Sequence, residues 1–86
     1  MINNTKFKQS RNEPAMRVNE LKRDNIKDLL HNKGISYKEF ADRIMVTRIA
    51  MEWFLDGSRI PKITVVRNMA VFLKCDINDI AVTEFL

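Results

Sequence analysis

The stretch that decides the fold is GISYKEFADRIMVTRIAMEWFLDG, which runs from Gly34 to Gly57. Ser36 and Glu39 have the spacing of a capping box, so we expect a helix to begin there. Val46 and Thr47 are β-branched residues that interrupt this helix, and Thr47 is a suitable N-cap for a second helix that Gly57 ends. The stretch therefore predicts two short helices, over about 36–44 and 47–56, joined by a tight break.

This spacing is typical of a helix-turn-helix, because a tight connection sets the two axes at a large angle and lets the second helix protrude. The second helix carries apolar residues on every side, although a surface helix of a small domain needs only one apolar face. We assign Met51, Phe54 and Leu55 to the core. Ile49 and Trp53 are then left on the outer face, where they need another explanation.

Helical patterns also extend on both sides of this stretch. We expect a helix over about 19–32, which Gly34 ends, and another over about 62–73 with a consistent apolar face. The residues DIND, Asp76 to Asp79, predict the cap of a last short helix. No segment has a strong strand pattern, so we predict an all-α domain of five helices over residues 18–86. The apolar tail VTEFL is expected to pack on the domain or on a partner.

The first seventeen residues, MINNTKFKQSRNEPAMR, have neither a helical nor a strand period. Four basic residues, Lys6, Lys8, Arg11 and Arg17, stand against one acidic residue, Glu13. We predict a flexible basic arm over 1–17. Such an arm either contacts nothing or follows a nucleic-acid backbone or groove.

Composition excludes several classes of function. The 86 residues suffice for one domain, and the net charge of +4 favours a polyanionic partner. Cys75 is the one cysteine, so there is no internal disulfide and no Cys/His cluster that predicts a metal site. His31 is the one histidine and lies in no catalytic motif, so we expect no enzyme activity and no cofactor. No apolar run is long enough for a membrane span, and we expect a cytoplasmic protein.

The chain resembles the Cro/phage-repressor class of helix-turn-helix DNA-binding domains, which are lambda repressor-like and XRE-type. The resemblance covers about 26–81, roughly two-thirds of the chain. It implies a compact five-helix fold. The residues that match the usual pattern of this class are Gly34, Ile35, Ser36, Glu39, Phe40, Ala41, Ile44, Val46, Thr47, Met51, Phe54, Gly57 and Pro61.

Three departures from the pattern bear on function and stability. Tyr37 replaces the glutamine that commonly opens the second helix, and its hydroxyl can still donate to a phosphate. Met45 replaces the glycine of the turn, which costs about 1 kcal/mol if its φ angle is positive. Leu30 and Leu55 stand where related repressors often hold a buried Arg–Glu pair. Because both partners are replaced, no buried charge is stranded, and we infer a Leu30–Leu55 contact.

The resemblance places the outer face of the second helix in the DNA major groove. There Arg48 suits guanine, Glu52 suits a cytosine amine and Ile49 suits a thymine methyl group. Trp53 is bulky and suits the sugar-phosphate wall of the groove. Contacts with the DNA backbone are expected from Tyr37, Lys38, Thr47, Ser58, Arg59 and Lys62.

Two functions remain open from the sequence. The first is a sequence-specific regulator, a bacterial or phage repressor that binds double-stranded DNA at a palindromic operator as a homodimer. The second is a protein-binding derivative of the fold, such as an antirepressor or assembly factor, that grips its partner with Ile49 and Trp53. In that case Arg48 and Glu52, four residues apart, simply form a surface ion pair.

Overall fold

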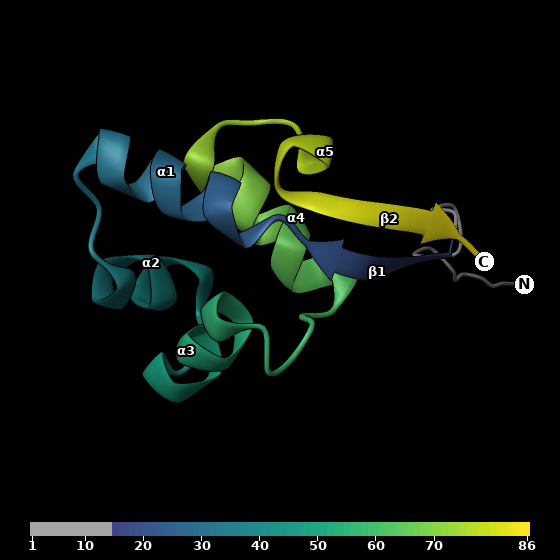
Figure 1. The fold of residues 1–86 in the computed structure, drawn as a ribbon, viewed down its shortest axis with the longest axis horizontal. Helices are drawn as coiled ribbons and strands as arrows, with labels where there is room; N and C mark the ends of the chain where they lie inside the picture. Colours follow the sequence, from purple (N-terminus) through teal and green to yellow (C-terminus); the bar gives the residue numbers. More distant parts are fainter. Residues whose placement is uncertain (1–14) are drawn as a thin grey trace, which may run out of the picture.

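The computed structural model describes residues 15–86, so most of the predicted arm, residues 1–14, lies outside the described residues. It contains the five predicted helices and, in addition, two strands (Figure 1). In chain order the elements are β1 (Met16–Leu21), α1 (Arg23–Lys33), α2 (Tyr37–Ile44), α3 (Arg48–Asp56), α4 (Ile63–Leu73), α5 (Ile77–Ile80) and β2 (Ala81–Phe85). The expectation of an all-α fold is therefore correct for the helices and wrong for the two ends of the domain.

The helix-turn-helix is confirmed, and its boundaries follow from local caps. The Ser36 hydroxyl accepts a hydrogen bond from the Glu39 backbone N–H at 3.1 Å, which begins α2. The Thr47 hydroxyl accepts from the Ala50 N–H at 3.0 Å, which begins α3. Met45 has a φ of 62° and Gly57 a φ of 88°, so both helices end on a left-handed residue. The predicted cost of a non-glycine turn residue therefore applies to Met45.

The core lies between the four longer helices and continues to α5. Leu30 from α1 and Leu55 from α3 are both buried in it, as the inferred contact between them requires. No charged or polar residue is buried among the described residues. Pro61 is buried as well. The buried hydrophobic residues that form the core are Leu21, Ile26, Leu30, Phe40, Ala41, Ile44, Met51, Phe54, Leu55, Val66, Met69, Ala70, Leu73, Ile80 and Ala81.

The two strands form an antiparallel ribbon from the ends of the described chain. Met16 pairs with Phe85 at the tip, and Leu21 pairs with Ala81 at the buried base. The predicted first helix consequently begins at Arg23, because residues 19–21 belong to β1. Met16 and Arg17, expected at the end of the arm, belong to β1 as well. The apolar tail packs by strand pairing, which a pattern within one segment does not reveal.

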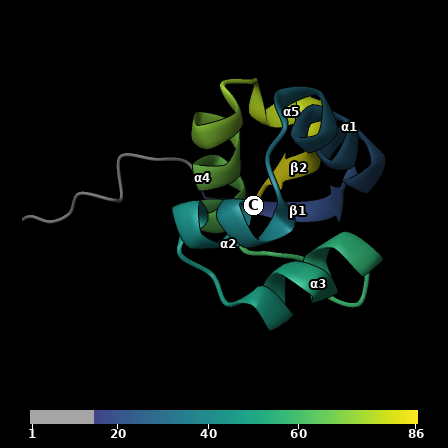
Figure 2. The ribbon, with the colours of Figure 1, turned by 90° about the vertical axis from the view of Figure 1, so that its left-hand side faces the viewer.

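The ribbon and the helix-turn-helix occupy different parts of the molecule. Helices α2 and α3 lie at one side, while the tip of the ribbon extends past α4 at the opposite end (Figure 1). In a view turned by 90°, α3 again lies below the ribbon, on the side of β1 (Figure 2). None of the helices among residues 15–86 is long and apolar enough to cross a membrane.

Candidate nucleic-acid interface

The outer face of α3 is exposed as the sequence predicts. Ile49 is 58% exposed and Trp53 is 38% exposed, and both are large apolar side chains. The side chains of Arg48 and Glu52 are exposed on the same helix, 65% and 60% respectively. The inner face of α3, in contrast, is fully packed in the core. Ile49 and Trp53 are thus not core residues, and their exposure leaves them free to contact a partner.

Arg48 and Glu52 form an ion pair along this face. The Arg48 Nε lies 3.8 Å from the Glu52 Oε2, across one turn of the helix. A pair of this kind in solvent contributes a few tenths of a kcal/mol at most, about 0.3–0.5. It therefore gives way at little cost when a stronger partner, such as the edge of a guanine, approaches Arg48.

Trp53 is covered on one side by the loop that follows α3. The Arg59 guanidinium carbon lies 4.3 Å from the centre of the Trp53 ring, in a cation–π arrangement. The Arg59 backbone N–H also donates to the Trp53 carbonyl oxygen at 3.3 Å. Trp53 and Arg59, which the sequence analysis assigns to the groove wall and to the DNA backbone, therefore pack together. Within residues 15–86 the stacked guanidinium of Arg59 has no hydrogen-bond acceptor, so its N–H groups are available at the edge of α3.

The turn between α3 and this loop is fixed by Gly57 and Asp56. A Cβ at Gly57 would lie 2.7 Å from Arg23 Nη1, and the φ of 88° also disfavours any other residue. The Ser58 N–H donates to Asp56 Oδ1 at 2.7 Å. Hydrogen bonds from Ser58, with the charges of Arg23 and Lys27, lower the pKa of the Asp56 carboxyl. Ser58 thus has an established role in the turn, beside its expected contact with DNA.

The remaining residues that are predicted to contact the DNA backbone are exposed, and they lie at the starts of three helices. Tyr37 and Lys38 open α2, and the Lys38 Nζ lies 3.6 Å from Asp42 Oδ2. Thr47 is the N-cap of α3 and Lys62 that of α4. Exposed cations near helix N-termini suit phosphate groups, because backbone N–H groups also point outward there.

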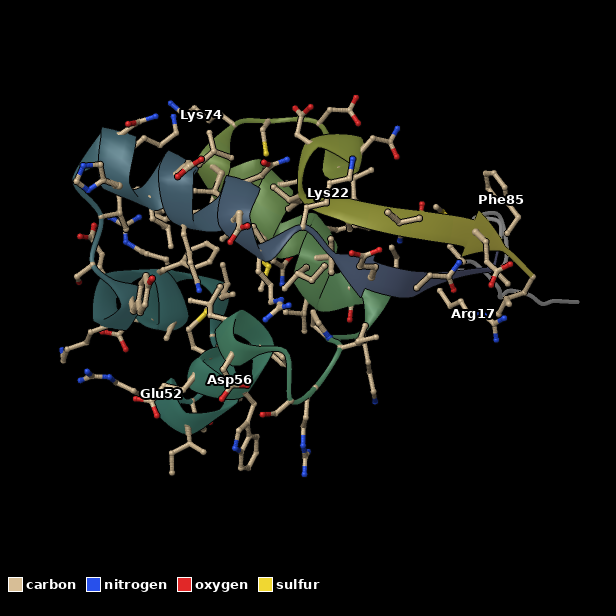
Figure 3. The ribbon with its side chains drawn as sticks, in the orientation of Figure 1. Arg17, Lys22, Glu52, Asp56, Lys74 and Phe85 are labelled. Atoms are coloured by element: carbon tan, nitrogen blue, oxygen red, sulfur yellow. The ribbon has the colours of Figure 1, made fainter. Side chains whose placement is uncertain are left out.

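The structure adds two basic residues of α1 that the sequence analysis missed. Lys27 shares with Tyr37, Glu52 and Asp56 a hollow of about 240 Å³ beside α3. Arg23, one turn earlier, approaches Gly57. Figure 3 shows Glu52 and Asp56 along α3, where their negative charges oppose phosphate binding. Lys27 and Arg23 offset that charge. The sequence does show that Arg23 and Lys27 are four residues apart and so share one face of α1. It does not show that this face lies beside α3.

Comparison with known proteins supports the fold. No family model matches the chain, and no curated protein is significantly similar to it. Among solved structures, the chain is similar to the crystal structure of the transcriptional regulator VanUg in its form II, with a TM-score of 0.62. The identity is 19%, over 98% of this chain and 99% of that one. At this identity the likeness shows that the two chains share a fold over almost their whole length.

Proposed function

We propose that the protein is a sequence-specific, double-stranded-DNA-binding transcriptional regulator and acts in the cytoplasm as a repressor. The observation that carries this proposal is the exposed outer face of α3, held by capped ends and a packed inner face. The resemblance to Cro-type repressors and the shared fold with a transcriptional regulator support it. The proposal includes no enzyme activity, no cofactor and no membrane partner.

In this function α3 enters the major groove. Arg48 leaves Glu52 to donate two hydrogen bonds to a guanine, and Ile49 packs on a thymine methyl group. Glu52, once released, accepts from a cytosine amine. Trp53 and the stacked Arg59 lie along the wall of the groove, where the guanidinium binds a phosphate.

Contacts with phosphates position α3 in the groove. Lys38 at the start of α2 and Lys62 at the start of α4 flank the helix in the chain and supply positive charge. Tyr37, Thr47 and Ser58 add hydroxyl or backbone donors. Because one short helix contacts few base pairs, the proposal includes a homodimer on a palindromic operator.

A second function is favoured by one specific observation. Ile49 and Trp53 form an exposed apolar pair, which is the kind of surface that marks a protein interface. A protein-binding derivative of the fold would use Trp53 as its anchor, and Trp53→Ala would cost that complex about 2 kcal/mol or more. If the protein instead binds DNA, Trp53→Ala should weaken binding less than Arg48→Ala does.

The test is selection of duplexes from a random-sequence pool, followed by gel shifts at two salt concentrations. Lys38→Gln and Arg59→Gln should each weaken binding to every duplex and reduce the salt slope by about one unit. Lys74→Gln is the matched control, because Lys74 is exposed on a side of the molecule away from Glu52 and Asp56 (Figure 3). No enriched sequence and no salt dependence would contradict the proposal.

A further inference from the structure

A hollow at the C-terminal end of α3 brings together two arginines from distant parts of the chain. It has a volume of about 130 Å³, and its lining comes from the end of β1, the start of α1, α3 and the loop after α3. That loop passes below β1 in both views (Figures 1 and 2). Arg23 contributes to the lining from α1, and Arg59 contributes from the loop. Two positive charges are therefore concentrated beside the helix that we propose to enter the major groove.

Both guanidinium groups have a neighbour that determines where they lie. A Cβ at Gly57 would be 2.7 Å from Arg23 Nη1 and 2.9 Å from Arg23 Cζ, so the missing side chain leaves room for this guanidinium against the turn. The Arg59 guanidinium is stacked on the Trp53 ring. Less side-chain entropy is lost on binding when donors are already in place.

The hollow carries an excess of positive charge. Within residues 15–86 neither Arg23 nor Arg59 forms an ion pair. Glu20 is the carboxylate in the lining, so one of the two positive charges is left over. The charge of Arg23 also lowers the pKa of Asp56, but that carboxylate accepts its hydrogen bond from the Ser58 N–H. Two guanidinium groups that share a hollow favour an anion between them.

We infer that Arg23 and Arg59 together bind one phosphate group of the DNA backbone at the C-terminal end of α3. The inference rests on the proposed function and deepens it, because it gives α1 a direct contact with the duplex. A phosphodiester has two non-bridging oxygens, so each guanidinium can donate to one of them. The phosphate then connects α1 with the loop after α3 and holds the turn between them.

A purely structural role for Arg23 makes a different prediction. A cation at the C-terminal end of a helix stabilises that helix through its dipole, and Arg23 lies beside the end of α3. In that case Arg23→Gln should lower the free energy of unfolding, and its effect on DNA binding should depend on no particular phosphate. The test therefore has to identify the phosphate itself.

Duplexes with one neutral methylphosphonate at a time provide this test. A duplex with a single half-site is used, so that one copy of the chain is bound. Arg23→Gln and Arg59→Gln should each weaken binding to the unmodified duplex about tenfold, as for loss of a charge-assisted contact. At one modified position both substitutions should lose their effect, because the phosphate that they contact has no charge there. This position should be the same for the two variants.

Salt dependence and two control variants complete the experiment. The double variant should reduce the salt slope no more than Arg59→Gln alone, because only one phosphate contact is lost. Lys33→Gln is the matched control, since Lys33 is an exposed cation at the other end of α1, and it should leave binding unchanged. Lys38→Gln should lose its effect at a different phosphate, because Lys38 lies at the start of α2.

Three results would overturn the inference: full binding by Arg23→Gln, different phosphates for Arg23 and Arg59, or an effect of Arg23→Gln that persists at every modified position. Urea unfolding of each variant shows whether a loss of binding comes from a loss of folding. Arg23→Lys keeps the charge without the fork and should recover part of the affinity. If the unsubstituted chain shows no salt-dependent binding to any duplex, the proposed function fails together with the inference, whereas the three results above contradict the inference alone.

Discussion

The helix-turn-helix and the terminal ribbon are stabilised in opposite ways. In α2 and α3 the caps act within three residues of chain, and the inner faces of both helices are buried. In the ribbon each pair joins residues sixty or more positions apart, such as Arg17 and Glu84. Only Leu21 and Ala81, at its base, are buried. The helix-turn-helix is therefore a rigid platform, while the ribbon is anchored at one end and open at the other.

This difference in packing bears on the proposed function. A helix that contacts bases has to be held in place by its inner face, because specificity needs a fixed geometry. The ribbon tip, in contrast, is held by strand pairing and little packing, so its side chains contribute less to the stability of the domain. Substitutions in the helix-turn-helix should accordingly change the stability of the domain and its base preference. Substitutions at the ribbon tip should change both much less.

The largest effect is expected in the core beneath α3. Leu30→Arg or Leu55→Glu alone should lower the free energy of unfolding by about 3–5 kcal/mol, because each buries an unpaired charge. The double variant should recover much of the loss by pairing the two charges. Urea denaturation measures all three. A double variant no more stable than the worse single one would show that Leu30 and Leu55 are not in contact.

The exposed ribbon tip provides the comparison for this result. Phe85→Ala should change the free energy of unfolding of the monomer by about 0.5 kcal/mol or less, since most of its surface is already in water. Denaturation at low protein concentration keeps dimerisation out of the measurement. A loss as large as that of the Leu30 variant would mean that the tip is part of the core.

The next effect is on base preference. Arg48→Ala should weaken binding to the selected duplex by about 1–3 kcal/mol and relax the preference at one base pair. Binding to unrelated duplexes should hardly change, because Arg48 has a base rather than a phosphate as its partner. Titrations against duplexes with single base-pair changes measure this. A uniform loss on all sequences would assign Arg48 to the backbone instead.

A gain of stability is expected at the turn. Met45 has a φ of 62° and is 89% exposed, so its side chain contributes strain and almost no packing. Met45→Gly should raise the free energy of unfolding by about 0.5–1 kcal/mol, after the entropy that glycine adds to the unfolded chain. Met45→Ala, which keeps the Cβ, is the control and should give no such gain.

The smallest effect concerns acid and the ribbon. A hydrogen bond and the positive charge of Arg17 lower the pKa of Glu84, with help from Asn19. Because the folded pKa is the lower one, this contribution is present above the unfolded pKa of about 4.3 and is lost as the pH falls through the folded pKa. An NMR titration should show the midpoint of Glu84 rising in Arg17→Gln. An unchanged midpoint would exclude the pair in solution.

Much of the helical region was predictable, because its signals are local. Ser36, Thr47 and Gly57 each determine a boundary through neighbours a few residues away, and those neighbours are visible in the sequence. The alternation of buried and exposed positions then identifies the outer face of α3. For the same reason Arg48, Ile49, Glu52 and Trp53 could be placed together before the structure was known.

The ribbon and part of the candidate interface were not predictable in this way. Residues 16–21 and 81–85 become strands by pairing with each other, and neither segment has a strong pattern alone. The stacking of Arg59 on Trp53 depends on how the loop folds back after Gly57. The approach of Lys27 to α3 depends on the packing of α1. Each of these contacts is tertiary, and local propensity does not encode it.

The most direct test of the account uses the fluorescence of Trp53, the one tryptophan of the chain. A selected duplex, and then a scrambled one, is titrated into the protein at two salt concentrations. We predict a saturable change in emission, because Trp53 and the stacked Arg59 meet the groove wall. Affinity should fall as salt rises and should be higher for the selected duplex. Unchanged emission with no salt-dependent binding to either duplex would contradict the assignment of α3 to DNA.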